Sequence, residues 1–216
     1  MIEIRNLIVE KGESVILKIP NASIDVSKGT AIFGENGAGK TTFVKCILGI
    51  ERYKGTIESS ICKNKIQVLM QKNSYPPYAK TKDILKLILD KRDLSSLSTL
   101  LHMFDFEKNL NKKIAVLSGG ELQKLNLILA FSKSHQILIV DEVTTGLDYT
   151  TRWKLLNYIR DYRKNNNIGF IIVSHYPEEI KALCDNVICL KNGNLVSHCQ
   201  VDTFFKNLKE DGEMYV

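Results

Sequence analysis

The N-terminal part of the chain alternates apolar and polar residues, whereas its later apolar stretches are short and uninterrupted. Alternation over residues 2–8 and again over 14–19 predicts two half-buried antiparallel strands. An apolar run over residues 30–33 predicts a buried strand, and the helical character of residues 43–48 predicts a helix soon after it. Further strands are predicted over residues 56–58 and 66–70.

After the Pro76-Pro77 break the pattern changes, because leucine, isoleucine and phenylalanine now recur at helical spacing. This change predicts a small helical subdomain, over approximately residues 72–134, inserted into the core. The elements predicted next are a helix over 121–132, a strand over 137–140, a helix over 151–164, a strand over 168–173, a helix over 177–184 and a strand over 187–190. Asn192-Gly193 is a hairpin turn signal.

Helices that alternate with strands are typical of an α/β fold. We predict one domain over residues 1–216, with a mixed or parallel sheet flanked by helices, an N-terminal antiparallel β subdomain and the inserted helical subdomain. A hydrophobic content of 44% in 216 residues is enough to bury a core without disulfides or metals. The longest apolar runs, over 137–140 and 170–173, are far shorter than the roughly 20 residues that span a bilayer. We therefore expect no transmembrane helix.

Composition excludes several other classes of protein. Residues 1–9 lack the basic-then-apolar layout of a secretory signal, so a cytoplasmic location is expected. Five cysteines without a Cys-x-x-Cys pair favour neither a disulfide framework nor a zinc site. The net charge of +6 comes partly from lysines that are interleaved with apolar residues and form no block. We interpret them as a solvated surface and do not expect a nucleic-acid partner.

The most specific chemical signal is a glycine-rich loop between the strand over 30–33 and the helix that follows. Gly34-x-x-x-x-Gly39-Lys40-Thr41 matches the phosphate-loop pattern, in which backbone N–H groups and a helix N-terminus surround phosphate oxygens. Lys40 is expected at the β- and γ-phosphates of ATP, and the Thr41 hydroxyl is expected to ligate Mg²⁺. The predicted ATP-binding residues are Gly34, Glu35, Asn36, Gly37, Ala38, Gly39, Lys40, Thr41 and Thr42.

Two carboxylates, Asp141 and Glu142, follow the apolar run over 137–140. They are expected at the carboxyl end of a buried strand, where α/β folds bind ligands. We predict that Asp141 holds Mg²⁺, and that Glu142 is the general base that takes a proton from the attacking water.

The segment Leu117-Ser118-Gly119-Gly120-Glu121 precedes a predicted helix. The Ser118 hydroxyl and the N–H groups of Gly119 and Gly120 therefore form either a second anion site or an ordinary helix cap. The pattern alone does not decide between these two roles.

Taken together, these motifs resemble the nucleotide-binding subunit of an ATP-binding cassette (ABC) transporter. The loop GENGAGKTT, the signature LSGGE and the segment IVDEVTTGLD stand in family order between residues 34 and 148. Gln71 follows a predicted strand, as the family's metal-sensing glutamine does, and His175 follows another, as the family's switch histidine does. The resemblance implies a P-loop NTPase core and ATP hydrolysis.

The resemblance also implies a mechanism that uses two subunits. Two such domains enclose two ATP molecules, so that the signature residues Ser118, Gly119, Gly120 and Glu121 act on the nucleotide of the opposite subunit. His175 is then expected at the γ-phosphate, Gln71 at Mg²⁺ or the attacking water, and Asp148 at the partner's phosphate loop. Taken alone, the position of His175 also fits a plain surface imidazole.

The chain departs from the family pattern in three places. No aromatic residue for stacking on adenine lies near Lys11, so Lys11 is expected to cover the base with its aliphatic stem and a cation–π contact. Glu121 replaces the usual signature glutamine, and Val143 replaces a proline. Because Glu142 and His175 are present, hydrolysis is expected.

The resemblance implies a second nucleotide-binding subunit, identical or different, and a separate membrane permease at the inner face of the cell membrane. The helical subdomain is where the family contacts its permease, and residues 75–78 are either part of that contact or a plain surface turn. With only 41 residues after His175, the layout favours export of a peptide, antibiotic or lipid. The alternatives are an ABC ATPase that acts on ribosomes or nucleic acid, and a phosphate-loop kinase.

Overall fold

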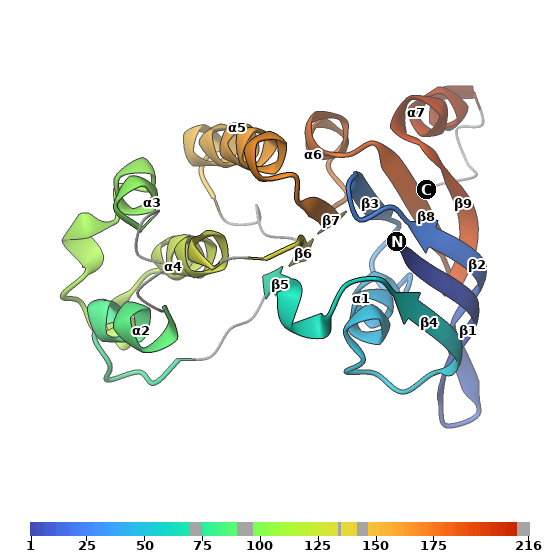
Figure 1. The fold of residues 1–216 in the computed structure, drawn as a ribbon, viewed down its shortest axis with the longest axis horizontal. Helices are drawn as coiled ribbons and strands as arrows, with labels where there is room; N and C mark the ends of the chain where they lie inside the picture. The colour runs from blue at the N-terminus through green and yellow to red at the C-terminus, as the bar shows by residue number, and fades with distance from the viewer. Residues whose placement is uncertain (70–74, 90–96, 134, 142–146, 211–216) are drawn as a thin grey trace.

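The computed structural model describes residues 1–69, 75–89, 97–133, 135–141 and 147–210. These residues form a nine-stranded mixed sheet in the order β4-β1-β2-β9-β8-β3-β7-β6-β5 (Figure 1). The strands are β1 (Ile2–Lys11), β2 (Ser14–Ile24), β3 (Gly29–Phe33), β4 (Lys54–Ser59), β5 (Ile66–Leu69), β6 (Ile137–Asp141), β7 (Gly169–Val173), β8 (Asn186–Lys191) and β9 (Asn194–Gln200).

Parallel pairing dominates the centre of the sheet. Strand β3 pairs in parallel with both β7 and β8, and β6 pairs in parallel with β5 and β7. At the other side, β1 pairs antiparallel with β2 and β4, which confirms the predicted antiparallel N-terminal strands. The β8–β9 hairpin turns at Asn192 and Gly193, whose φ angles of 48° and 74° fit the two-residue turn that the sequence predicts.

The central strands divide their side chains between two hydrophobic cores. Ala31, Leu138 and Ile172 pack in one core, whereas their neighbours Ile32, Ile139 and Ile171 pack in the other. This division follows from the two-residue repeat of a strand, which directs successive side chains to opposite faces. The sheet centre is therefore covered on both faces, as its uninterrupted apolar sequence requires.

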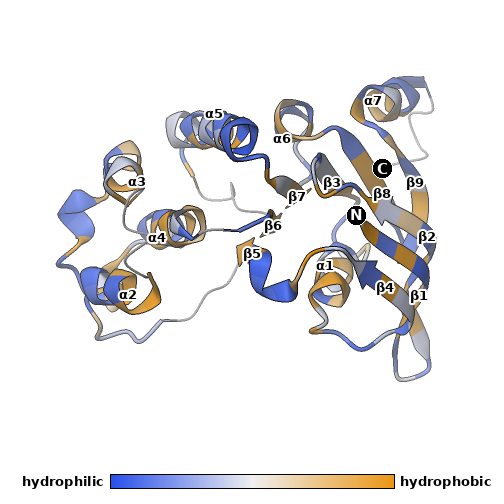
Figure 2. Cartoon of the chain, in the orientation of Figure 1, coloured by the Kyte–Doolittle hydropathy of each residue, from blue (hydrophilic) through white to orange (hydrophobic). Residues whose placement is uncertain are grey.

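Helices cover the two faces unequally. Helix α1 packs with the β1, β2 and β4 strands over one core, whereas the remaining helices contribute to the other core. Much of α5 is drawn in hydrophilic colours in Figure 2, and it buries only a stripe formed by Leu155, Leu156 and Ile159. The helices are α1 (Lys40–Leu48), α2 (Thr81–Ile88), α3 (Leu97–Met103), α4 (Gly119–Ser132), α5 (Tyr149–Asn166), α6 (Pro177–Leu183) and α7 (Val201–Glu210). No helix of the described residues is both long enough and apolar enough to cross a bilayer.

Helices α2, α3 and α4 lie between β5 and β6 in the sequence and project to one side in Figure 1. The Tyr75 hydroxyl donates a hydrogen bond of 2.7 Å to the buried Asn126 of α4, so Tyr75 belongs partly to this helical packing. Pro76, Pro77 and Tyr78 are exposed, and Tyr78 is exposed to 82%. The bounds of the helical subdomain, residues 72–134, remain a prediction.

The sequence pattern did not predict strand β9 or helix α7. Strand β9 has one polar face and few large apolar residues, so its alternation is weak in the sequence. Helix α7 buries Val201, Phe204 and Phe205, which follow the i, i+3, i+4 spacing of a short amphipathic helix.

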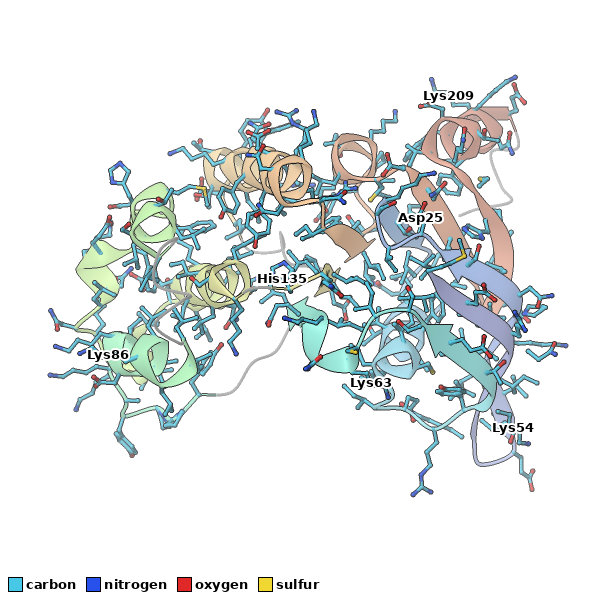
Figure 3. The ribbon with its side chains drawn as sticks, viewed as in Figure 1. Asp25, Lys54, Lys63, Lys86, His135 and Lys209 are labelled. Atoms are coloured by element: carbon cyan, nitrogen blue, oxygen red, sulfur yellow. The ribbon has the colours of Figure 1, made fainter. Side chains whose placement is uncertain are left out.

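The labelled lysines in Figure 3 are spread over the molecule. Lys54, Lys86 and Lys209 stand on β4, α2 and α7, at well-separated edges of the view.

His135, labelled near the centre of Figure 3, is 7% exposed and lies just before β6. Its Nδ1 lies 2.7 Å from the Lys133 carbonyl oxygen, so Nδ1 donates, and among the described residues its buried Nε2 has no partner. Burial lowers the pKa of the imidazole below its usual range. Below about pH 6.5 the unfolded chain then binds more protons than the folded one, so the free energy of unfolding falls as the pH falls.

We predict that His135→Asn, which keeps a donor toward the Lys133 carbonyl, flattens the pH dependence of the free energy of unfolding between pH 5 and pH 7, measured by urea denaturation. Part of the slope should remain, because burial also lowers the pKa of His198. The control is His102→Asn, since the His102 side chain is 93% exposed. If the free energy of unfolding depended on pH equally in the two variants, burial of His135 would not be the cause of the slope.

Candidate ATP-binding site

The glycine-rich loop runs directly from β3 into α1, and its conformation requires glycine at particular positions. Gly37 and Gly39 adopt φ angles of 85° and 96°, a region that side chains disfavour. A Cβ on Gly34 would lie 2.2 Å from the Leu190 carbonyl oxygen, and a Cβ on Gly39 would lie 2.9 Å from a methyl group of Leu17. The loop is therefore held against β8 and β2 by contacts that admit no side chain.

Helix α1 begins without a side-chain cap. Gly39 is its N-cap, no side-chain hydrogen bond closes the turn, and its first turn contains no acidic residue. The N–H groups of that turn have no partner within the helix, and the helix dipole adds a partial positive charge. Such an N-terminus is suited to bind phosphate oxygens.

Lys40 is 6% exposed and its Nζ donates hydrogen bonds of 2.8 Å to the carbonyl oxygens of Gly34 and Glu35. These contacts hold the ammonium group within the loop that it is predicted to serve. A cavity of about 340 Å³ opens beside it, near the lower limit of the volumes usual for small-ligand sites. The cavity is lined by Lys11, Ile16, Asn36, Gly37, Gly39, Lys40, Thr41, Thr42 and Asp141.

Thr41 and Asp141 meet at the floor of this site. The Thr41 hydroxyl donates a hydrogen bond of 3.0 Å to Oδ2 of Asp141, which is 4% exposed at the end of β6. A hydroxyl and a carboxylate are the oxygen ligands that Mg²⁺ prefers, and the two groups are close enough to hold one ion between them. These residues therefore fit the predicted metal. Glu142 and Gln71, the predicted base and sensor, lie outside the described residues.

His175 follows β7, beside the end of β6, because Asp141 pairs with Val173 in the sheet. It is exposed, and its ring centroid lies 4.2 Å from that of Tyr176. The buried Ser174 donates a hydrogen bond of 2.6 Å to Glu179, which also forms an ion pair of 2.8 Å with Arg152. Sequence reasoning missed Arg152 and Glu179; the available signal was a glutamate beside the buried Ile180 of α6.

Ser118 caps α4 in the manner of a capping box. Its Oγ accepts a hydrogen bond of 3.2 Å from the Glu121 N–H, and the Glu121 carboxylate accepts one of 2.9 Å from the Ser118 N–H. Hydrogen bonding to Lys112, and next to the Ser118 N–H, lowers the pKa of Glu121. The ordinary cap is thus present, and Ser118 and Gly119 are also exposed. Their role on a partner's nucleotide stays a prediction.

Asp148 caps α5 in a similar way. Its carboxylate accepts hydrogen bonds from the Thr151 N–H at 2.9 Å and from the Thr151 hydroxyl at 2.6 Å. These bonds, the hydroxyl first, lower the pKa of Asp148. Asp148 is exposed, and its predicted contact with a partner's phosphate loop is not tested within one chain.

Comparisons with known proteins agree with this geometry. The family model described as "ABC transporter" matches residues 17–145. The ATP-binding protein of a tungstate uptake system from Peptoclostridium acidaminophilum is 30% identical, over 94% of this chain and 99% of its own length. This chain belongs to the ABC transporter family. The zinc import ATP-binding protein of Magnetococcus marinus is also 30% identical, over 86% of this chain and 72% of that protein.

Solved structures support the same fold. An ATP-binding subunit of an ABC transporter aligns over 100% of this chain and 95% of its own with a TM-score of 0.86, at 22% identity. A dimeric ATP-binding cassette in a post-hydrolysis state, bound to ADP and phosphate, aligns over 93% of this chain and 99% of its own with a TM-score of 0.80, at 20% identity. The predicted P-loop NTPase core is confirmed, and the chain is an ABC-type ATP hydrolase.

The expected direction of transport is not supported. Both relatives are named for uptake or import, and the tungstate relative is nearly the same length as this chain. A short segment after His175 therefore does not distinguish an exporter from an importer.

We predict that Lys40→Ala raises the dissociation constant for ATP by at least about tenfold, because hydrogen bonds to a charged donor contribute about 1.5–3 kcal/mol each. Titration calorimetry measures the change. The control is Lys45→Ala in the last turn of the same helix, which should bind ATP as the parent protein does. Unchanged affinity in Lys40→Ala would refute the assignment of the loop.

Among the residues that the structure describes, those lining the cavity include no aromatic side chain, and Lys11 and Ile16 stand there instead. We predict that ATP and GTP bind with affinities within about tenfold of each other, because contact with the aliphatic stem of Lys11 and with Ile16 does not distinguish one purine base from the other. Lys11→Tyr should tighten the binding of both nucleotides. A strong preference of the parent protein for ATP, measured by competition, would show that another residue holds the base.

Proposed function

We propose that this chain is the ATP-hydrolysing subunit of an importer, which works as one of a pair of nucleotide-binding subunits with a separate membrane permease. The observation that carries the proposal is the 3.0 Å contact between Thr41 and the buried Asp141 beneath the phosphate loop. It joins the end of β6 to the start of α1 and supplies the two oxygen ligands that Mg²⁺·ATP requires.

In the proposed reaction, water attacks the γ-phosphorus, and the bond to the β,γ-bridging oxygen breaks to give ADP and inorganic phosphate. Glu142 takes the proton of the water, and His175 orients the water and the γ-phosphate. Lys40 and the N–H groups at the start of α1 stabilise the charge on the phosphate oxygens. Thr41 and Asp141, with Gln71 as the predicted further contact, would hold Mg²⁺, which would neutralise part of the phosphate charge.

We place the signature residues Ser118, Gly119, Gly120 and Glu121 on the nucleotide of the facing subunit. Ser118 begins α4, which packs with α2 and α3, whereas the phosphate loop begins α1 on the other side of β5 and β6 in Figure 1. The exposure of Ser118 and Gly119 supports this placement, since a partner's phosphates can reach them. Asp148 contacts the partner's phosphate loop in the same arrangement.

The direction is import because the relatives reported above are named for uptake of tungstate and import of zinc. We propose a small solute as cargo, carried through a separate permease, with this subunit at the inner face of the membrane. The names of these relatives support this function over one on ribosomes or nucleic acid.

We predict that Glu142→Gln reduces ATP turnover by at least about a hundredfold, the usual size of a general-base contribution. The phosphate loop and Asp141 are unchanged in this variant, so it should retain ATP and accumulate as a dimer with Mg·ATP in size-exclusion chromatography. A variant that elutes only as a monomer with Mg·ATP would count against the paired arrangement.

The direction of transport is tested in cells that lack this gene. We expect them to contain less of the transported solute, measured by elemental analysis for metals and oxyanions and by amino-acid analysis. The wild-type gene should restore the content, and a Glu142→Gln gene should not. A rise in the content of one solute on deletion would contradict import.

A further inference from the structure

A partly buried ion pair joins α5 to α6 beside the segment that carries His175, and the proposed reaction does not use it. Arg152 Nη2 lies 2.8 Å from Glu179 Oε1, and the two side chains are 24% and 2% exposed. Burying two charges removes them from water at a cost that their attraction often fails to recover, so such a pair adds little to stability by itself. Its contacts point to a role other than stability.

The carboxylate of Glu179 holds both neighbours of His175. Its Oε2 accepts a hydrogen bond of 2.6 Å from the Ser174 hydroxyl, and the Ser174 Oγ accepts one of 3.1 Å from the Tyr176 N–H. Ser174 is 2% exposed, so water does not compete for these bonds. The Glu179 carboxylate therefore orients the Ser174 hydroxyl, which in turn bonds the backbone on the far side of His175.

The guanidinium of Arg152 holds the same segment through an aromatic ring. It lies 4.0 Å from the centroid of the Tyr176 ring, and the His175 ring lies 4.2 Å from the same ring. An arginine at this distance from a ring is attracted to it, and Glu179 fixes the direction of the guanidinium. The Arg152–Glu179 pair therefore contacts both residues that flank His175.

We propose that Arg152 and Glu179 are positioning residues for His175 and set its place relative to the first turn of α5. The Arg152 N–H donates a hydrogen bond of 2.9 Å to the Asp148 carbonyl oxygen, so Arg152 belongs to the turn that Asp148 caps. Asp148 is predicted to face the partner subunit. The pair then holds His175 to the same turn that meets the partner. This inference rests on the proposed role of His175 in hydrolysis.

The test is Glu179→Gln, in which the amide oxygen still accepts from Ser174 but the charge that orients Arg152 is gone. We expect kcat to fall by about tenfold or more, since small misplacements of a catalytic group cost that much, while the affinity for ATP stays within about twofold. Arg152→Lys, which keeps a positive charge, should retain more activity than Arg152→Met.

A second ion pair between the same two helical segments supplies a matched control. Arg163, near the end of α5, lies 3.3 Å from Asp185, just after α6, and Asp185 accepts a hydrogen bond of 2.7 Å from the Gly29 N–H. Gly29 starts β3, at the end opposite the phosphate loop. Asp185→Asn should lower the melting temperature and leave kcat of the folded protein unchanged.

A double variant separates a positioning role from a merely structural one, and the quantity measured is its kcat. In a His175→Ala background, Glu179→Gln should cause no further loss of kcat beyond about twofold, because its effect passes through His175. A further loss as large as in the parent protein would overturn the proposal. So would a parental kcat in Glu179→Gln, or an equal loss of kcat in Asp185→Asn. Absence of ATP turnover in the wild-type protein would instead refute the proposed function itself.

Discussion

The candidate site depends on the in-register parallel pairing of β3, β7 and β6. Ile32 lies opposite Val173, and Val173 lies opposite Asp141, so the three strands end side by side. The phosphate loop, the Asp141 carboxylate that is predicted to bind Mg²⁺ and the segment of His175 lie at these ends. Since each strand is covered on both faces by a hydrophobic core, the three chemical groups are held in place by burial of apolar side chains that take no part in the chemistry.

Polar contacts then hold individual side chains in place at these strand ends. Lys40 is held by two loop carbonyl groups, Thr41 is held by Asp141, and His175 is flanked by residues that Glu179 fixes. Each contact joins elements that are distant in the sequence or closes a loop on itself. The remaining candidate groups, the signature at the start of α4 and Asp148 at the start of α5, are exposed helix caps. A site completed by a second subunit requires such an arrangement, in which some groups are held within the chain and others are exposed to the partner.

Local patterns predicted most of this arrangement, and tertiary contacts account for what they missed. The glycines of the phosphate loop and the apolar run before Asp141 each mark the end of a strand. They could be recognised because each signal lies in the same short segment as the structure that it predicts. Arg152 and Glu179 escape sequence reasoning because their pairing joins α5 to α6 across 27 positions in the chain. Strand β9 escaped because its side chains are exposed or only half-buried, so its sequence contains few large apolar residues. The direction of transport escaped because the length of the chain after His175 does not determine it.

The most direct test of the paired site mixes two variants that are each defective alone. In a Glu142→Gln background, one subunit carries Lys40→Ala and the other carries Ser118→Arg, and retained ATP is measured after gel filtration. If the signature acts on the opposite subunit, only the mixture contains an intact site, and it should retain one ATP per mixed dimer. If the mixture retains no more ATP than either variant alone, the phosphate loop and signature do not combine across subunits, and the account is contradicted.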